Sequence, residues 1–168
     1  VTSKGLSLRF LEEQARPMGR TAAGVAGIKP VGNDVLVGLA LVSDQSTLLV
    51  ASENGIGKRT SFGEYRSQTR GGKGIITMKV TGKTGQVVGA VAVEEDDELM
   101  LMTTGGQSIR IRCSEVRETG RNAQGVKLVT LRGNEKLQDI AKVVAGDDDE
   151  EESEDSGEDA PPTVDQEE

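Results

Sequence analysis

The chain has 168 residues and a formal net charge of −8, but the charge is unevenly distributed. Residues 147–168 hold 13 acidic and no basic residues, whereas residues 1–146 hold 15 acidic and 20 basic ones. An acidic segment of this kind repels itself and has little apolar surface to bury, so we expect a disordered acidic tail at 147–168. The mildly basic body favours a polyanionic partner.

The rare residue types exclude several classes of chemistry. The chain has no histidine and one cysteine, Cys113, which excludes a histidine general base, zinc-finger spacing, a Cys-His nucleophile pair and an intrachain disulfide. We expect Cys113 to be a small apolar filler in a reducing, cytoplasmic setting. No apolar run approaches the length that spans a membrane, so no membrane partner is expected.

The elements predicted in chain order are short strands separated by glycine-rich turns. They are expected at residues 6–10, 25–31, 35–42, 47–52, 58–62, 75–81, 87–93, 99–104, 108–112, 126–132 and 137–144. Three long polar connections lie between them, and no long amphipathic helix is evident.

The three long connections resemble one another at a period of about 50 residues. Arg20, Arg70 and Arg121 are each followed by three small or polar residues, a glycine and a β-branched residue. We therefore predict three repeats at about 1–44, 45–96 and 97–146, the last ending the body that precedes the tail. Because the chain opens inside a repeat without methionine, we expect a fragment of a longer protein.

Four short strands per repeat indicate an all-β, propeller-like array of blades. Three blades would not close a ring, which again favours a fragment. A β-sandwich is the competing architecture, but the strict period argues against it.

The sequence QTRGGKG at residues 68–74 is the main candidate binding loop. Gly71 and Gly72 allow close backbone approach with exposed amides, and Arg70 and Lys73 beside them suit a phosphate. The alternative is a cationic turn that touches nothing. Further cations lie on the connections or on the strands just before them. The residues expected to bind DNA are Arg16, Arg20, Lys58, Arg59, Arg66, Arg70, Gly71, Gly72, Lys73, Arg110, Arg112 and Arg121.

Equivalent connections of an array share one side, so their cations would form a track for the phosphates of duplex DNA. Few aromatics disfavour single-strand binding, and no helix is placed to read a major groove. What remains is sequence-independent binding and bending of duplex DNA. The alternatives are scattered solubilising charges, or a protein-interaction propeller whose basic rim docks an acidic partner.

Two other features could in principle be a cation site or a catalytic nucleophile, and neither is interpreted as one. The acidic run Glu94–Glu98 is interpreted as a solvated turn rather than a cation site, and Tyr65 as a packing residue rather than a DNA-cleaving nucleophile. The fragment is therefore expected to hold no catalytic residues, metal or cofactor.

With these residues in view, the chain resembles the C-terminal domain of the DNA gyrase A subunit. The resemblance is carried by RFLEEQARPMGRTAAGVAGI, by ENGIGKRTSFGEYRSQTRGGKGIITMKVTGKTGQVVGAV and by SEVRETGRNAQGVKL, and it covers nearly all of residues 1–144. The family's hallmark box reads QRRGGKG, and residues 68–74 match six of its seven positions, with Thr69 replacing an arginine.

The resemblance implies a six-bladed β-pinwheel that wraps DNA around its outer edge. It also implies membership of a type II topoisomerase that introduces negative supercoils, with ATP and Mg²⁺ bound elsewhere in the holoenzyme. The implied partners are duplex DNA and the gyrase B subunit, in an A2B2 assembly. Acidic tails in this family are thought to modulate wrapping. The paralogous topoisomerase IV subunit is the alternative, and the tail favours gyrase.

Overall fold

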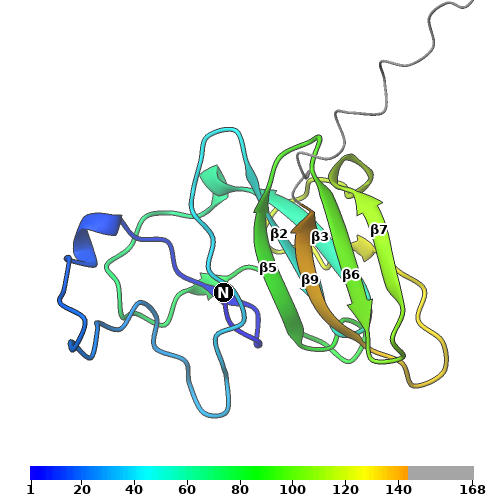
Figure 1. Cartoon of the computed structure of the whole chain (residues 1–168), viewed down its shortest axis with the longest axis horizontal. Helices are drawn as coiled ribbons and strands as arrows, with labels where there is room; N and C mark the ends of the chain where they lie inside the picture. The colour runs from blue at the N-terminus through cyan, green and yellow to red at the C-terminus, as the bar shows by residue number, and fades with distance from the viewer. Residues whose placement is uncertain (144–168) are drawn as a thin grey trace, which may run out of the picture.

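The computed structural model describes residues 1–143, and within them the chain is all-β apart from three single-turn 3₁₀ helices (Figure 1). The predicted acidic tail at 147–168 lies outside the described residues. The strands are β1 (Leu6–Ser7), β2 (Thr47–Ser52), β3 (Ile56–Ser61), β4 (Ile75–Ile76), β5 (Val87–Val93), β6 (Glu98–Thr103), β7 (Ser108–Arg112), β8 (Val126–Lys127) and β9 (Leu137–Val143). The 3₁₀ helices are η1 (Glu12–Gln14), η2 (Phe62–Glu64) and η3 (Cys113–Glu115).

Each of the two larger sheets is built around the first strand of a hairpin. In the second repeat β2 pairs antiparallel with both β3 and β5, and in the third repeat β6 pairs in the same way with β7 and β9. The sheet orders are therefore β5-β2-β3-β8 and β7-β6-β9. The all-β, propeller-like architecture predicted from the sequence is confirmed.

The strands of one sheet do not all come from one repeat, because one strand crosses to the preceding repeat. β8 belongs to the third repeat but pairs with β3 of the second, and β4 of the second repeat pairs with β1 of the first. β4 and β8 span two residues each where strands of seven residues were predicted. Each of them pairs with only two residues of the neighbouring strand, β4 with β1 and β8 with β3.

The core consists of two apolar layers, one at each junction between repeats. On β2, Leu48 and Val50 face the layer shared with the first repeat, while Leu49 and Ala51 face the layer shared with the third. This is why β2 reads as a continuous apolar run, since both of its faces are covered. The repeats thus bury their apolar surface against one another.

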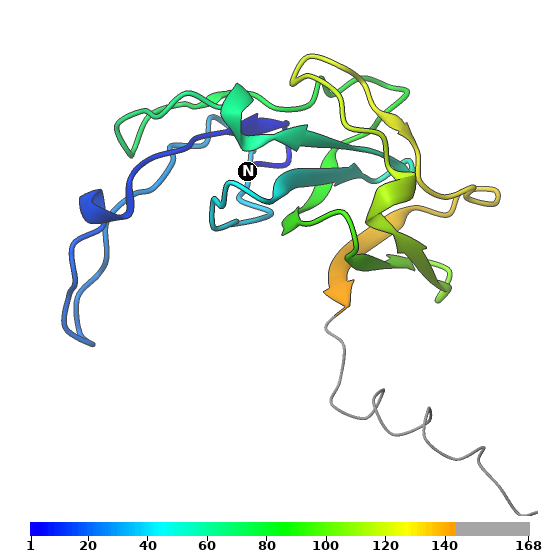
Figure 2. The same ribbon diagram turned by 90° about the horizontal axis from the view of Figure 1, so that it is seen from above.

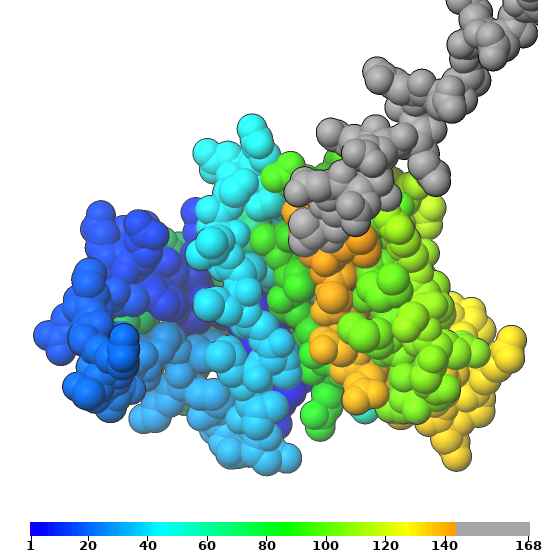
Figure 3. All heavy atoms as spheres, viewed as in Figure 1, coloured from blue at the N-terminus to red at the C-terminus, as the bar shows by residue number. Residues whose placement is uncertain are grey.

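The first repeat forms fewer strands than predicted. Of the strands expected at 25–31 and 35–42, only the isolated bridges Ile28–Gly72 and Thr2–Leu36 are present. A strand needs a hydrogen-bonding partner, and within residues 1–143 the 35–42 segment forms backbone hydrogen bonds only with Val1 and Ser3. Leu39 and Leu41 are consequently more than 80% exposed. Repeat 1, coloured blue to cyan, lies to one side of the packed sheets (Figure 3).

Glycine marks the place where neighbouring repeats cross most closely. A Cβ on Gly89 of β5 would lie 2.5 Å from Cγ1 of Ile140 on β9, and one on Gly38 would lie 2.6 Å from the carbonyl oxygen of Ala90. The counterpart of Gly89 in the third repeat is Asp139, which is exposed because no strand of the described residues packs there.

This difference gives a matched pair of substitutions. Gly89→Val should lower the free energy of unfolding by about 1–3 kcal/mol, because the added atoms overpack the junction. Asp139→Val, at the same register of the outer strand, should change it by less than about 1 kcal/mol. Denaturant unfolding followed by far-UV circular dichroism measures both. Equal effects of the two variants would contradict the close crossing at Gly89.

Candidate nucleic-acid interface

The long connections of the second and third repeats each lie against the preceding repeat (Figure 2). The amide of Gln68 donates to the carbonyl oxygen of Arg9 at 2.8 Å, and the amide of Thr119 donates to that of Arg59 at 2.9 Å. These two bonds are equivalent in the repeat register. The connections therefore follow one another along the array, each seated on the repeat before it.

At each junction an arginine of one repeat, Arg9 or Arg59, donates hydrogen bonds to the start of the next repeat's long connection. Nη1 of Arg9 donates to the carbonyl oxygens of Phe62 (2.9 Å) and Tyr65 (3.4 Å), and Nε of Arg59 donates to that of Val116 at 2.6 Å. These acceptors belong to η2 and η3 or to the residues that end them, where helix carbonyls need partners. Arg9 was not among the predicted site residues, although the repeat period places Arg59 and Arg110 at equivalent positions.

Lys58 and Arg59 are buried, so the expectation that they line an exposed cationic track is wrong. Lys58 is fully buried, and its Nζ donates to the carbonyl oxygens of Gly120, at 2.8 Å, and of Arg121. Arg59 is 5% exposed and pairs with Glu95 at 2.7 Å. Both side chains also donate to backbone carbonyls of the third repeat.

The pKa values of Lys58 and Glu95 are both lowered, for different reasons. Loss of solvation lowers the pKa of Lys58 to about 8; the nearby Glu64 carboxylate opposes this shift and the Arg121 guanidinium adds to it. The hydrogen bond from Arg59 holds the pKa of Glu95 below its usual value. Lys58 is thus a buried cation whose partners are backbone carbonyls rather than a carboxylate.

The recurring arginines are only partly available to a ligand. Arg70 and Arg121 are half-buried, and each donates to a backbone carbonyl of the preceding repeat, whereas Arg20 is exposed. Arg70 and Arg121 are therefore tied to the preceding repeat, and the binding of all three arginines to DNA stays a prediction.

The glycine amides of the QTRGGKG loop are not simply offered to a ligand, as the sequence suggested. The amide of Gly71 donates to the carbonyl oxygen of Gly27 at 2.6 Å, and the carbonyl of Gly72 accepts from the amide of Lys29 at 2.8 Å. Gly71 and Gly74 have φ angles of 76° and 82°, which favour glycine. The loop is therefore fixed by its backbone to the first repeat.

The remaining predicted cations are exposed. Arg16, Arg20, Arg66, Lys73 and Arg112 belong to this group. Arg110 is exposed as well but is paired with Glu98 across the β6–β7 hairpin. The exposed cations on the connections can meet a polyanion without breaking any ion pair found within residues 1–143. Their binding to DNA stays a prediction.

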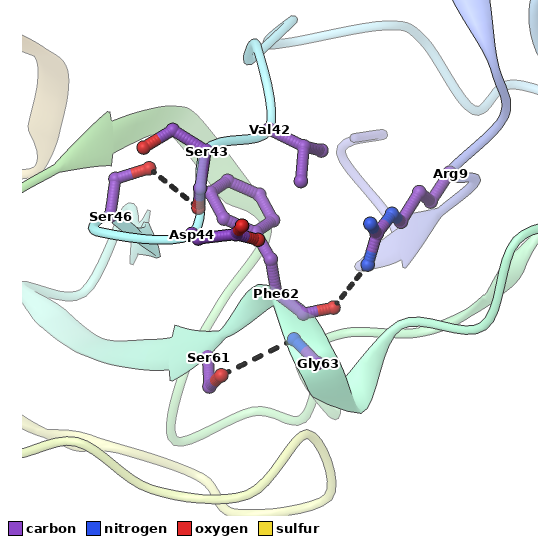
Figure 4. A pocket seen from close by; sticks show the side chains of 8 residues that line it. All are labelled: Arg9, Val42, Ser43, Asp44, Ser46, Ser61, Phe62 and Gly63. Atoms are coloured by element: carbon purple, nitrogen blue, oxygen red, sulfur yellow. Dashed lines mark hydrogen bonds between the residues drawn. The ribbon is translucent and has the colours of Figure 1, made fainter.

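A pocket of about 220 Å³ opens beside Arg9 at the first junction (Figure 4). Its wall includes Asp44 and the serines at 43, 46 and 61. Asp44 is the counterpart of Glu95, but it forms no ion pair with Arg9 within the described residues. The pocket occupies the position that the Arg59–Glu95 pair fills at the second junction, and none of the predicted site residues lines it.

The features weighed as chemistry have structural roles. Tyr65 is 3% exposed and its hydroxyl lies 2.6 Å from that of Thr77, while burial raises its pKa. Cys113 is fully buried in the second apolar layer, as predicted, and burial raises its pKa to about 11. Within residues 1–143, no group of three or more His, Cys, Asp or Glu side chains is placed to hold a metal. No helix of that part is long and apolar enough to cross a membrane.

The sheets pack on one another through apolar layers, and the connections of the second and third repeats each lie on the preceding repeat. This arrangement defines a propeller-type repeat domain. The family described as "DNA gyrase C-terminal domain, beta-propeller" matches residues 1–43, 46–94 and 97–143. The chain belongs to this family.

Two curated relatives of the chain are DNA gyrase A proteins. The chain is 48% identical over 127 residues to the DNA gyrase A protein of Helicobacter pylori, covering 74% of this chain and 15% of the relative. It is 47% identical over 164 residues to that of Lawsonia intracellularis, covering 95% and 19%. It therefore spans less than a fifth of the length of these relatives.

Solved structures agree with this membership. A DNA gyrase A C-terminal domain superposes with a TM-score of 0.78 at 32% identity, covering 86% of this chain and 49% of that one. The C-terminal domain of a DNA topoisomerase IV also superposes with a TM-score of 0.78, at 25% identity, covering 85% and 45%.

Proposed function

We propose that the repeats bind and bend duplex DNA without sequence specificity, as part of the A protein of a DNA gyrase. Membership of the gyrase C-terminal domain family is the observation that carries this proposal. The exposed cations of the connections support it, because they are spaced along the array on segments that recur in equivalent places. Such a surface neutralises phosphates without reading bases.

The whole enzyme extends beyond this chain. We propose that the chain belongs to a cytoplasmic type II topoisomerase that introduces negative supercoils and hydrolyses ATP, in an A2B2 assembly with the gyrase B subunit. The cleavage chemistry, ATP and Mg²⁺ would belong to other parts of that assembly. The contribution of the described repeats is to hold a bent duplex in place for it.

A salt titration tests the binding. The affinity of the full chain for a linear duplex of mixed sequence should fall steeply as salt rises, since each neutralised phosphate contributes about 0.9 to the slope of log K against log salt. A second duplex of unrelated sequence should bind equally well and serves as the control for specificity. A flat salt response, or strong preference for one duplex, would refute the proposal.

A further inference from the structure

We propose that the recurring arginine of the connections is a positioning residue that fixes each connection to the preceding repeat. We propose further that Lys73 makes the phosphate contact of the QTRGGKG loop. Because Lys73 has this role only if the domain binds duplex DNA, the inference rests on the proposed function and deepens it.

The Arg70 side chain bonds to the first repeat. Its Nε donates to the carbonyl oxygen of Gln14 at 2.9 Å, and its Nη1 donates to that of Ala26 at 3.2 Å. The backbone amide of Arg70 donates to the side-chain oxygen of Gln14, also at 2.9 Å. The guanidinium therefore joins the end of η1 to the segment that pairs with the loop.

Arg121 repeats two of these three contacts at the second junction. Its Nη1 donates to the carbonyl oxygen of Ile76 at 2.8 Å, and its backbone amide donates to the Oε2 of Glu64 at 3.3 Å. Ile76 and Glu64 lie 50 residues after Ala26 and Gln14, so these acceptors are equivalent as well as the donor. The Nε of Arg121 has no hydrogen-bond partner within residues 1–143, but the two contacts shared by both junctions indicate that the arginine links repeats.

Lys73 differs in every one of these respects. Its side chain is exposed and makes no hydrogen bond or ion pair within residues 1–143. It does not recur, because its counterparts are Ala23 and Gln124. It lies between two positive-φ glycines in a loop whose backbone is held by the first repeat. A cation with no structural partner in the described part of the chain, on a fixed loop, is available to a phosphate.

The salt dependence of duplex binding separates the two roles, because its slope counts the phosphates neutralised. With the full chain and a linear duplex, Lys73→Gln should reduce the magnitude of the slope by about 0.9. Arg70→Gln should leave the slope at the wild-type value. If Arg70→Gln reduced the slope as much as Lys73→Gln while Arg70→Lys did not, Arg70 would be a phosphate ligand and the inference would be wrong.

The exchange of the Gly71 amide hydrogen reports on the junction itself, since that amide bonds to Gly27. Both Arg70→Gln and Arg70→Lys should speed its exchange about tenfold, because lysine keeps the charge but not the forked geometry. Lys73→Gln should leave it unchanged. Unchanged exchange in both Arg70 variants would overturn the positioning role.

The two levels of failure are distinguishable. A wild-type chain that bound no duplex at all would refute the proposed function and with it the role of Lys73. The exchange measurements on the Arg70 variants would still decide the positioning role, because they need no DNA.

Discussion

Gly125→Ala is expected to lower the free energy of unfolding by about 3–4 kcal/mol, for two reasons that act together. Gly125 has a φ of 94°, a conformation that a residue with a Cβ adopts only at a cost of about 1–3 kcal/mol. A Cβ there would also lie 2.4 Å from the carbonyl oxygen of Gly57 on β3. Backbone would have to move, and the β3–β8 pairing beside it would be disturbed.

Gly24→Ala is the matched control. Gly24 occupies the equivalent position of the first repeat with a φ of 82°, but no atom lies within 4 Å of its would-be Cβ. Only the conformational cost remains, so this variant should lose about 2 kcal/mol at most. Denaturant unfolding monitored by circular dichroism compares the two. Equal losses would show that the contact with Gly57 is unimportant.

The stability of the chain should rise with pH between about 8 and 10.5 relative to that of a Lys58→Met variant. The pKa of Lys58 is about 8 in the folded protein and near its ordinary 10.5 when unfolded. In that window the unfolded state keeps a proton that the folded state has released, so raising the pH favours folding. The stabilisation is complete above 10.5 and is lost as the pH falls through 8. The difference between the curves should grow by about 3–4 kcal/mol.

Other groups titrate in this range, which is why the comparison with Lys58→Met matters. The pKa of Cys113 is raised to about 11, so its own contribution to stability is lost as the pH rises from 9. This contribution has the opposite sign and is shared by both proteins. Chemical denaturation at several pH values measures the difference. Parallel curves would show that the pKa of Lys58 is not lowered by burial.

The sequence predicted the parts of the fold that depend on local pattern. The central strands predicted at 47–52 and 99–104 are apolar runs between turn residues, and they are present as β2 and, shifted by one residue, β6. The inward position of Cys113 followed from its residue type. These features need no knowledge of which repeat lies next to which.

The exchange of strands between repeats could not be predicted, because β4 and β8 lie in apolar, β-branched stretches like those of strands that pair within their own repeat. Burial of Lys58 and Arg59 was missed for a related reason. Basic residues in a strand usually face solvent, but β3 is covered by a connection whose backbone carbonyls accept their hydrogen bonds. The recurrence of an arginine also has two interpretations. It can reflect binding to a periodic ligand such as DNA, or a contact that is repeated at every junction between repeats.

Because β4 and β8 pair with the preceding repeat, the boundaries of the sequence repeats do not coincide with those of the sheets. A chain shortened to residue 96 would hold two apparent repeats, yet β3 would lack β8 and Lys58 would lose both of its carbonyl acceptors. No single cut within the described repeats frees one blade intact. Gain or loss of a blade during evolution therefore alters its neighbours as well, and succeeds only when the incoming segment brings the same arginine and the same acceptors to the join.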